Sequence, residues 1–171
     1  RTFKSNITAM TYGDDNIMGV SLSSDWFNHS SLTEVFATMG ITYTDALKLG
    51  EIGITHRSIF KETFLKRFFR KDDEDDFIRA PLDKSSISKL LCVWVKSPNL
   101  TEDAQIAVIL ECALNFSHGW GREYYSRVTT LVKDVISSRP SLEHHVDFAG
   151  NTAQRIFPTY DELTRRMYID R

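Results

Sequence analysis

The chain has 171 residues, of which 42% are hydrophobic and 26% are charged, and its net charge is −2. These values describe an ordinary globular chain, long enough for one domain with a hydrophobic core, and they argue against a protein that coats nucleic acid uniformly. The longest apolar runs, Leu90 to Val95 and Ile106 to Leu110, are too short to cross a bilayer, and we expect no signal peptide. The two cysteines, Cys92 and Cys112, lie in helical patterns and are expected to be reduced and buried.

The chain begins at Arg1 and enters a strand-like run almost at once, so we expect a piece of a longer protein. Residues 7–12 and 16–20 are two strand candidates around Gly13-Asp14-Asp15, which predicts a β-hairpin. The capping-box pattern Ser31-Leu32-Thr33-Glu34 then predicts a helix, which Gly40 should end.

A short strand is expected at residues 41–44. Phe64-Leu65-Lys66-Arg67-Phe68-Phe69 alternates in character, which predicts a strand that points Lys66 and Arg67 to opposite faces. The acidic run 72–76 follows, and residues 77–79 then predict a second hairpin whose acidic tip is solvated.

After Pro81 the pattern becomes helical. Two capping signals stand out: Thr101 before Glu102 and Asp103, and the capping box Thr159-Tyr160-Asp161-Glu162. The helices are expected at about 85–96, from 101 to just before Gly119, from about 125 to just before Pro140, and from 159.

Tyr12-Gly13-Asp14-Asp15 carries the strongest chemical signal. Adjacent carboxylates on a tight turn repel each other, and a divalent cation relieves that repulsion. Oxygen ligands suit Mg²⁺ or Mn²⁺ rather than zinc, and Gly13 allows a sharp turn beside a substrate. Taken alone, the tetrapeptide favours a solvated acidic turn over a metal site.

The flanking strands change this interpretation. A strand, Tyr-Gly-Asp-Asp and a second strand resemble the catalytic hairpin, motif C, of RNA-dependent RNA polymerases. The segment from Gly40 to Lys48 is similar to motif D of the picorna-like members, and Phe64-Leu65-Lys66-Arg67-Phe68-Phe69 resembles their motif E. The Asn that follows the tetrapeptide and the style of the C-terminal segment favour the insect viruses of this class, dicistrovirus-like or iflavirus-like.

The resemblance implies an α+β fold: a partial polymerase palm of antiparallel hairpins plus helix over residues 1–80, then a mainly α-helical thumb over residues 81–171. It implies an RNA-directed RNA polymerase that replicates and transcribes a viral RNA genome by two-metal nucleotidyl transfer with Mg²⁺ or Mn²⁺. The roles that it implies are metal binding and catalysis for Asp14 and Asp15, general acid catalysis for Lys48, and RNA or primer binding for Tyr12, Gly13, Lys66 and Arg67.

The thumb offers weaker candidates. Arg122, Arg127 and Lys133 are candidates for phosphate contacts, although a solvated helix face is the favoured interpretation for any single one of them. His118, in a Leu-x-x-x-His-Gly pattern, is interpreted as a structural residue at a helix end.

The implied partners are an RNA template–primer duplex, nucleoside triphosphates, other viral replication proteins, and the fingers and remaining palm of the polymerase. Because motifs A and B are absent, we expect this chain alone to be inactive. The expected location is the host cytoplasm, at membrane-associated replication complexes. Two other hypotheses are a non-catalytic RNA-binding or protein-interaction helical module, and a small metal-dependent phosphohydrolase, which would need further clustered ligands.

Overall fold

The computed structural model describes residues 2–46, 56–72, 74–144 and 157–170, and the chain forms two compact units, Arg1–Leu65 and Lys66–Arg171. The boundary lies earlier than the expected one after residue 80, because the second hairpin packs with the helices that follow it. The assignment of residues 1–80 to a palm and 81–171 to a thumb stays a prediction. The elements are α1 (Phe3–Asn6), β1 (Ile7–Tyr12), β2 (Asp15–Val20), η1 (Leu22–Ser24), α2 (His29–Thr38), η2 (Ile59–Lys61), β3 (Thr63–Phe64), β4 (Arg67–Phe68), β5 (Arg70–Lys71), β6 (Ile78–Arg79), α3 (Lys84–Cys92), α4 (Glu102–His118), α5 (Arg122–Ser138), η3 (Pro140–His144), α6 (Tyr160–Thr164) and η4 (Arg165–Ile169).

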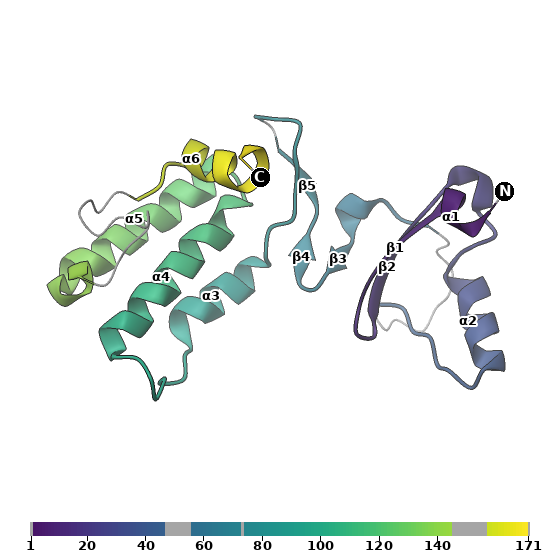
Figure 1. The fold of residues 1–171 in the computed structure, drawn as a ribbon, viewed down its shortest axis with the longest axis horizontal. Helices are drawn as coiled ribbons and strands as arrows, with labels where there is room; N and C mark the ends of the chain where they lie inside the picture. Colours follow the sequence, from purple (N-terminus) through teal and green to yellow (C-terminus); the bar gives the residue numbers. More distant parts are fainter. Residues whose placement is uncertain (1, 47–55, 73, 145–156, 171) are drawn as a thin grey trace. The chain divides into compact units, whose positions relative to one another are not determined.

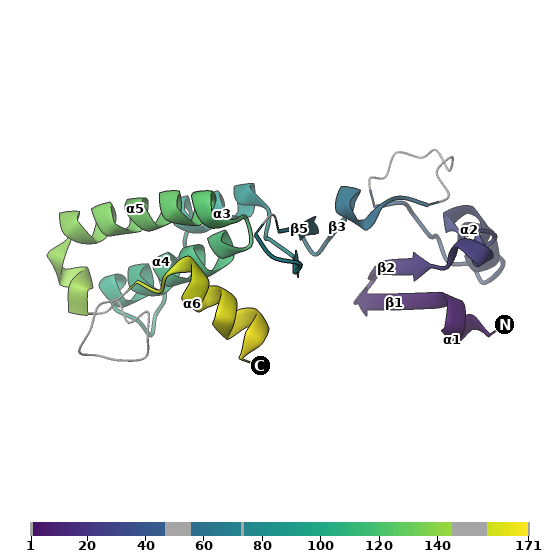
Figure 2. The same cartoon turned by 90° about the horizontal axis from the view of Figure 1, so that it is seen from above.

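The first unit is built on the predicted β1–β2 hairpin, whose strands lie antiparallel beside each other (Figure 2). Helix α2 begins two residues before the expected Ser31, because Asn28 forms the N-cap and shares a capping box with Ser31. Gly40, with φ +73°, ends it as predicted: Ile41 N donates to Phe36 O, and Gly40 N donates to Ala37 O. The strand expected at residues 41–44 is not formed.

The second unit is mainly helical, which confirms the expected α+β class. Helices α3, α4 and α5 lie side by side, and α6 packs on α4 and α5 (Figure 1). The shared apolar core consists of Leu110, Leu114, Tyr125, Val128, Val132, Leu142, Tyr160 and Leu163. Among the described residues, no helix is both long enough and apolar enough to span a membrane.

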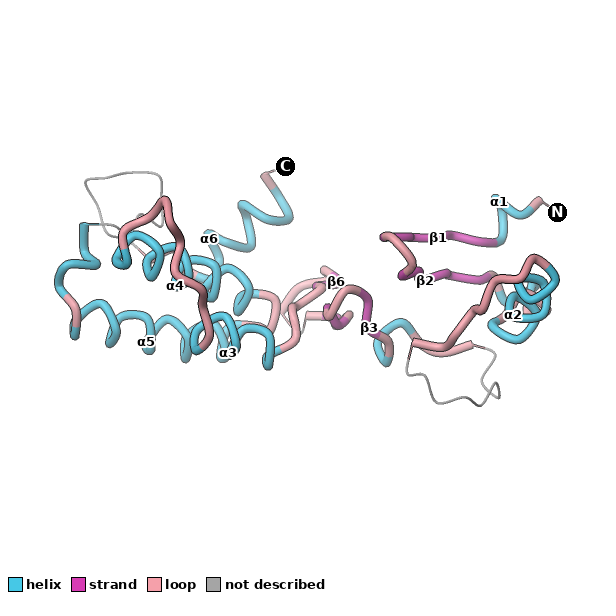
Figure 3. Tube along the Cα trace, turned by 90° about the horizontal axis from the view of Figure 1, so that it is seen from below, coloured by secondary structure: helices cyan, strands magenta, loops and turns pink. Residues whose placement is uncertain are grey.

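Helix α3 ends at Cys92, earlier than the expected 96. Val93 is extended, and a loop leads from there to α4 (Figure 3). Gln105 of α4 fixes this loop, because its side chain donates to Val95 O at 2.7 Å and accepts from Ser97 N at 2.8 Å. At the end of α3 Cys92 is exposed, and Cys112 in α4 is only half-buried, so the expectation that both cysteines are buried was wrong.

The β5–β6 hairpin was predicted with a solvated acidic tip, which holds for the exposed Glu74 and Asp76 but was wrong for Asp72. Asp72 is buried and forms an ion pair with Arg79, which has 0% exposed area. Arg79 also pairs with Asp75, and the Tyr160 hydroxyl donates to Asp72 at 3.0 Å. Burial by itself raises the pKa of Asp72, but the hydrogen bonds from Glu74 N and Tyr160, together with the charge of Arg79, outweigh it and lower the pKa below its usual value.

His118 is a buried structural residue at the end of α4. Its Nε2 lies 3.1 Å from Tyr160 O and 2.9 Å from Thr164 Oγ1, and its ring stacks on the Tyr160 ring at 4.4 Å. The two acceptors place the proton on Nε2, because the Thr164 hydroxyl itself donates to Tyr160 O. Burial, helped by the charge of Arg79, lowers the pKa of His118 to about 4.

This environment predicts acid sensitivity. In the unfolded chain His118 should titrate near its ordinary pKa of 6.5, so between pH 6.5 and 4 the unfolded state binds more protons than the folded state. The free energy of unfolding should therefore fall as the pH is lowered through this window, by up to about 3 kcal/mol. Urea unfolding followed by circular dichroism at pH 7 and pH 5 measures the change.

His118→Asn should be less stable at pH 7 and should lose much of this pH dependence, whereas His144→Asn, which changes an exposed histidine, should keep it. Equal acid sensitivity in wild type and His118→Asn would contradict the assignment. Asp72 does not contribute in this pH range, because its pKa is already lowered from 3.8.

Candidate functional site

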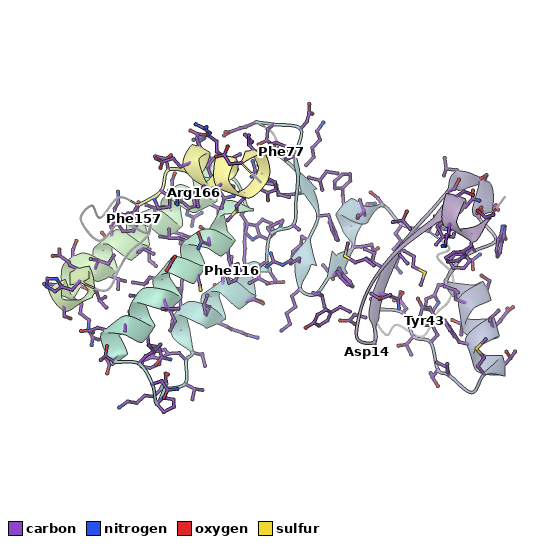
Figure 4. All side chains as sticks on the ribbon, viewed as in Figure 1. Asp14, Tyr43, Phe77, Phe116, Phe157 and Arg166 are labelled. Carbon is purple, nitrogen blue, oxygen red and sulfur yellow. The ribbon has the colours of Figure 1, made fainter. Side chains whose placement is uncertain are left out.

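The tight turn of the β1–β2 hairpin presents both predicted metal-binding carboxylates to solvent. Tyr12 pairs with Asp15, which leaves Gly13 and Asp14 as the two turn residues. Gly13 has φ +62° and Asp14 does not enter the positive-φ region, which is the pattern of a type II′ turn. Figure 4 shows Asp14 at the closed end of the hairpin. All four residues of the predicted motif are therefore brought together, and Tyr12 is 69% exposed.

The donor set of this turn fits a hard divalent cation. Asp14 and Asp15 offer carboxylate oxygens, the ligands that Mg²⁺ prefers, and a Cβ placed at Gly13 would meet no atom within 4 Å, so the space beside the turn is open. No group of three or more His, Cys, Asp or Glu side chains suited to a metal occurs within the described ranges. Two carboxylates make only part of a coordination shell, and further ligands would have to come from outside these residues.

A contact behind the turn was missed by the sequence reasoning. The Tyr43 hydroxyl donates to Asn16 Oδ1 at 2.8 Å, and Asn16 directly follows Asp15 in β2. The pattern had suggested a strand at 41–44, which would have used backbone groups instead of this side chain. The only hint in the sequence was a polar residue in a strand that otherwise carries apolar positions.

Lys48, the predicted general acid, lies outside the described residues. The ion pair between Asp45 and Arg57, at 4.0 Å, joins the described residues on either side of that stretch.

The alternating pattern had predicted that Lys66 lies in a continuous strand, and this prediction was wrong. Leu65 and Lys66 have φ of +52° and +59° and form a tight turn between β3 and β4. Successive positive φ values are typical of a type I′ turn, in which Gly and Asn are favoured, and each costs an L-residue with a side chain about 1–2 kcal/mol. Lys66 is exposed at this turn.

Hydrogen bonds hold the chain that follows the turn against residues 81–83, and Trp120 in turn holds Leu82. We call this group of contacts the seat of the turn. Asp83 N donates to Lys66 O at 2.8 Å, and Phe68 N donates to Pro81 O at 3.0 Å. Trp120, between α4 and α5, donates from Nε1 to Leu82 O at 2.7 Å. A Cβ at Gly119 would lie 3.0 Å from Pro81 Cα, which explains why a glycine follows His118.

Arg67 points into this seat instead of toward solvent. Its Nη1 donates to Ala80 O at 2.8 Å, and its guanidinium lies over the Phe116 ring at 5.7 Å. The contacts describe a structural role, and the predicted contact of Arg67 with RNA stays a prediction.

The three candidate phosphate contacts of the predicted thumb differ in what their charged groups contact. Arg122 is held by Glu74 and Asp161, with an N–O distance of 2.7 Å in each ion pair. Lys133 lies 5.3 Å from the centre of the Phe157 ring, while Arg127 is exposed. Arg122 therefore links the acidic hairpin to α6. Because two carboxylates already occupy its guanidinium, it is poorly suited to bind a phosphate.

The hairpin with two carboxylates, the turn with an exposed lysine and the helical segment occur in the order that the resemblance to RNA-dependent RNA polymerases predicted. Comparison with protein families identifies the class: the model of viral RNA-dependent RNA polymerases matches residues 2–136, and the chain belongs to this family.

Relatives include polyproteins of insect viruses. The replicase polyprotein of Acute bee paralysis virus (strain Rothamsted) is 38% identical over 93 residues, covering 53% of this chain and 5% of the polyprotein. The genome polyprotein of Deformed wing virus is 31% identical over 132 residues, covering 77% of this chain and 4% of the polyprotein. The expected likeness to polymerases of picorna-like insect viruses is therefore confirmed.

Among solved structures, the Sicinivirus 3Dpol RNA-dependent RNA polymerase has the same fold, with a TM-score of 0.63 and 19% identity. The alignment covers 95% of this chain and 30% of that polymerase. The chain thus spans about a twentieth of the polyproteins and less than a third of the solved enzyme.

The strained turn gives a stability prediction. Leu65→Gly removes a side chain from a residue with φ +52°, whereas Leu100→Gly removes one from a loop residue without positive φ; the two leucines are 40% and 46% exposed. Both variants lose chain entropy on folding to the same extent, but only Leu65→Gly relieves backbone strain. Leu65→Gly should therefore be more stable than Leu100→Gly by about 1 kcal/mol in urea unfolding. If Leu65→Gly is equally or less stable, the turn is not strained.

Proposed function

We propose that this chain supplies half of the catalytic metal site and the primer-holding turn of a viral RNA-directed RNA polymerase, which joins nucleotides by two-metal transfer. The observation that carries the proposal is the Tyr12–Asp15 pairing, which sets Asp14 and Asp15 at the exposed tip of a hairpin in a chain of this family. The substrates are nucleoside triphosphates and a primer–template RNA.

Asp14 and Asp15 would hold divalent cations together with ligands from the remainder of the enzyme. Bound Mg²⁺ or Mn²⁺ supplies charge neutralisation at the phosphates and lowers the pKa of the attacking hydroxyl. The turn contributes oxygen donors in fixed register, while Gly13 keeps the space beside them free of side chains.

Lys66 would bind the phosphate backbone of the primer near its 3′ end. A lysine at the tip of a tight turn, whose own carbonyl is fixed by Asp83 N, presents its charge from a constrained backbone. Lys48 would donate a proton to the leaving pyrophosphate, a role that rests on the resemblance to motif D. We further propose that the whole enzyme works in the host cytoplasm with other viral replication proteins.

The metal role of Asp14 is tested in the complete polymerase, with primer extension on a homopolymer RNA template in Mg²⁺ or Mn²⁺. Asp14→Asn keeps the size of the side chain and removes its charge, so the rate should fall at least about a hundredfold. Asp25→Asn makes the same change at an exposed position of the first unit away from the turn, and should extend the primer like wild type.

Residues 1–171 alone should not extend the primer. If Asp14→Asn is as active as wild type, the turn is not the metal site. If the wild-type complete protein is itself inactive, a non-catalytic RNA-binding or interaction module explains the chain better.

The role of Lys66 is tested by RNA affinity at several salt concentrations. Lys66→Gln should weaken primer–template binding and reduce the slope of log affinity against log salt by about 1, because one phosphate contact is lost. Lys71→Gln is the matched control: Lys71 is exposed but pairs with Asp76 at 3.0 Å, so its loss should leave the slope unchanged. An unchanged slope in Lys66→Gln would remove this lysine from the RNA interface.

A further inference from the structure

The hydrogen bond between Tyr43 and Asn16 joins two distant parts of the first unit. The donor and acceptor are 27 residues apart and 2.8 Å from each other. Asn16 pairs with Thr11 across the hairpin and directly follows Asp15 in β2.

Tyr43 is itself firmly held. Its ring packs between His29 and Phe36, with centroid distances of 5.0 Å and 5.2 Å. Both partners lie on α2, and the glycine turn at Gly40 brings the chain back from the end of that helix. Figure 4 shows Tyr43 between α2 and the hairpin. Tyr43 therefore connects a helix, through its ring, to the strand that carries Asp15, through its hydroxyl.

An isolated two-stranded hairpin is at best marginally stable in water, so contacts from outside must keep it in place. Exposed carboxylates at its tip contribute nothing to this. Because side chains alternate along a strand, Asn16 points to the face opposite to Asp15. Tyr43 thus holds the rear face of the strand and does not itself reach the face that Asp15 occupies.

We propose that Tyr43 is a positioning residue for the carboxylate turn: by fixing Asn16 it sets the orientation in which Asp14 and Asp15 meet a divalent cation. This inference rests on the proposed function and adds to it a residue that acts through another. Loss of the bond keeps both carboxylates in the chain but lets strand β2 move. This movement weakens cation binding more than it weakens binding of primer–template RNA.

The test uses the complete polymerase and Mn²⁺ as the probe. Tyr43→Phe keeps the ring and removes only the hydroxyl. Its affinity for Mn²⁺, measured without turnover from the electron paramagnetic resonance signal of free Mn²⁺, should fall about two- to tenfold, the range for one hydrogen bond. The Mg²⁺ concentration for half-maximal primer extension should rise by a similar factor, while the affinity for primer–template RNA stays as in wild type.

Two further variants make the result specific. Asn16→Ala should reproduce the effect, and the double variant should be no worse than either single one, because both remove the same bond. Tyr125→Phe is the matched control: it loses a tyrosine hydrogen bond to Pro158 O in the helical unit and should bind Mn²⁺ like wild type.

The outcomes separate this inference from the proposed function. If Asp14→Asn loses Mn²⁺ but Tyr43→Phe binds it like wild type, the positioning role is wrong and the metal site stands. If Tyr43→Phe lowers Mn²⁺ affinity, RNA affinity and thermal stability together, Tyr43 is merely structural and the inference is overturned. If Asp14→Asn binds Mn²⁺ like wild type, the proposed site itself fails.

Discussion

The second unit depends on the ion pairs that the buried guanidinium of Arg79 forms. A charge with no solvent exposure requires compensation, and Asp72 and Asp75 provide it from the same hairpin. Tyr160 then joins Asp72 across 88 residues of sequence, so the C-terminal segment is bound to the start of the unit. His118 stacks on the same tyrosine, and its pKa is low because the ring is buried, with the charge of Arg79 adding to the effect. The two ion pairs of Arg79, together with Tyr160, thus connect the acidic hairpin, the end of α4 and α6.

The turn at Gly13 and Asp14 and the turn at Leu65 and Lys66 meet the same backbone requirement with different residues. A two-residue turn needs positive φ values, which a glycine adopts without strain. Gly13 meets that need beside Asp14, so the carboxylates are presented from a relaxed backbone. At Leu65 and Lys66 no glycine is present, and the seat formed by Asp83, Pro81 and Trp120 must hold the strained backbone in place. A glycine at the position of Lys66 would make the turn more stable, but it would remove the ammonium group that we propose binds the primer.

What the sequence predicted correctly was local. The β1–β2 hairpin, the end of α2 at Gly40 and the caps at Thr101 and Thr159 each depend on a few neighbouring residues. The Leu65–Lys66 turn was missed because alternating aromatic and basic residues fit a strand equally well, and non-glycine residues rarely take positive φ. The burial of Asp72 was missed because Tyr160, one of its partners, lies far along the chain, and because nothing local shows that the nearby Arg79 is buried with it. The Tyr43–Asn16 bond was hidden for the same reason: no local pattern shows which tyrosine will reach a given strand.

The ion pairs of the acidic run bear on how a negatively charged segment can lie close in sequence to Lys66, the residue proposed to bind RNA. Residues 72–76 follow Lys66 closely, and a run of free carboxylates there would repel an RNA backbone. In the structure Asp72 and Asp75 are neutralised by Arg79, and Glu74 by Arg122. Arg79 is thereby buried, and Arg122, although exposed, is occupied by two carboxylates, while Lys66 and Lys84 stay exposed. The Lys84 ammonium lies over the Trp120 and Tyr124 rings. The proposed contact of Lys66 with RNA is therefore compatible with a net charge of −2, because three of the acidic side chains that follow it are paired with arginines within the fold.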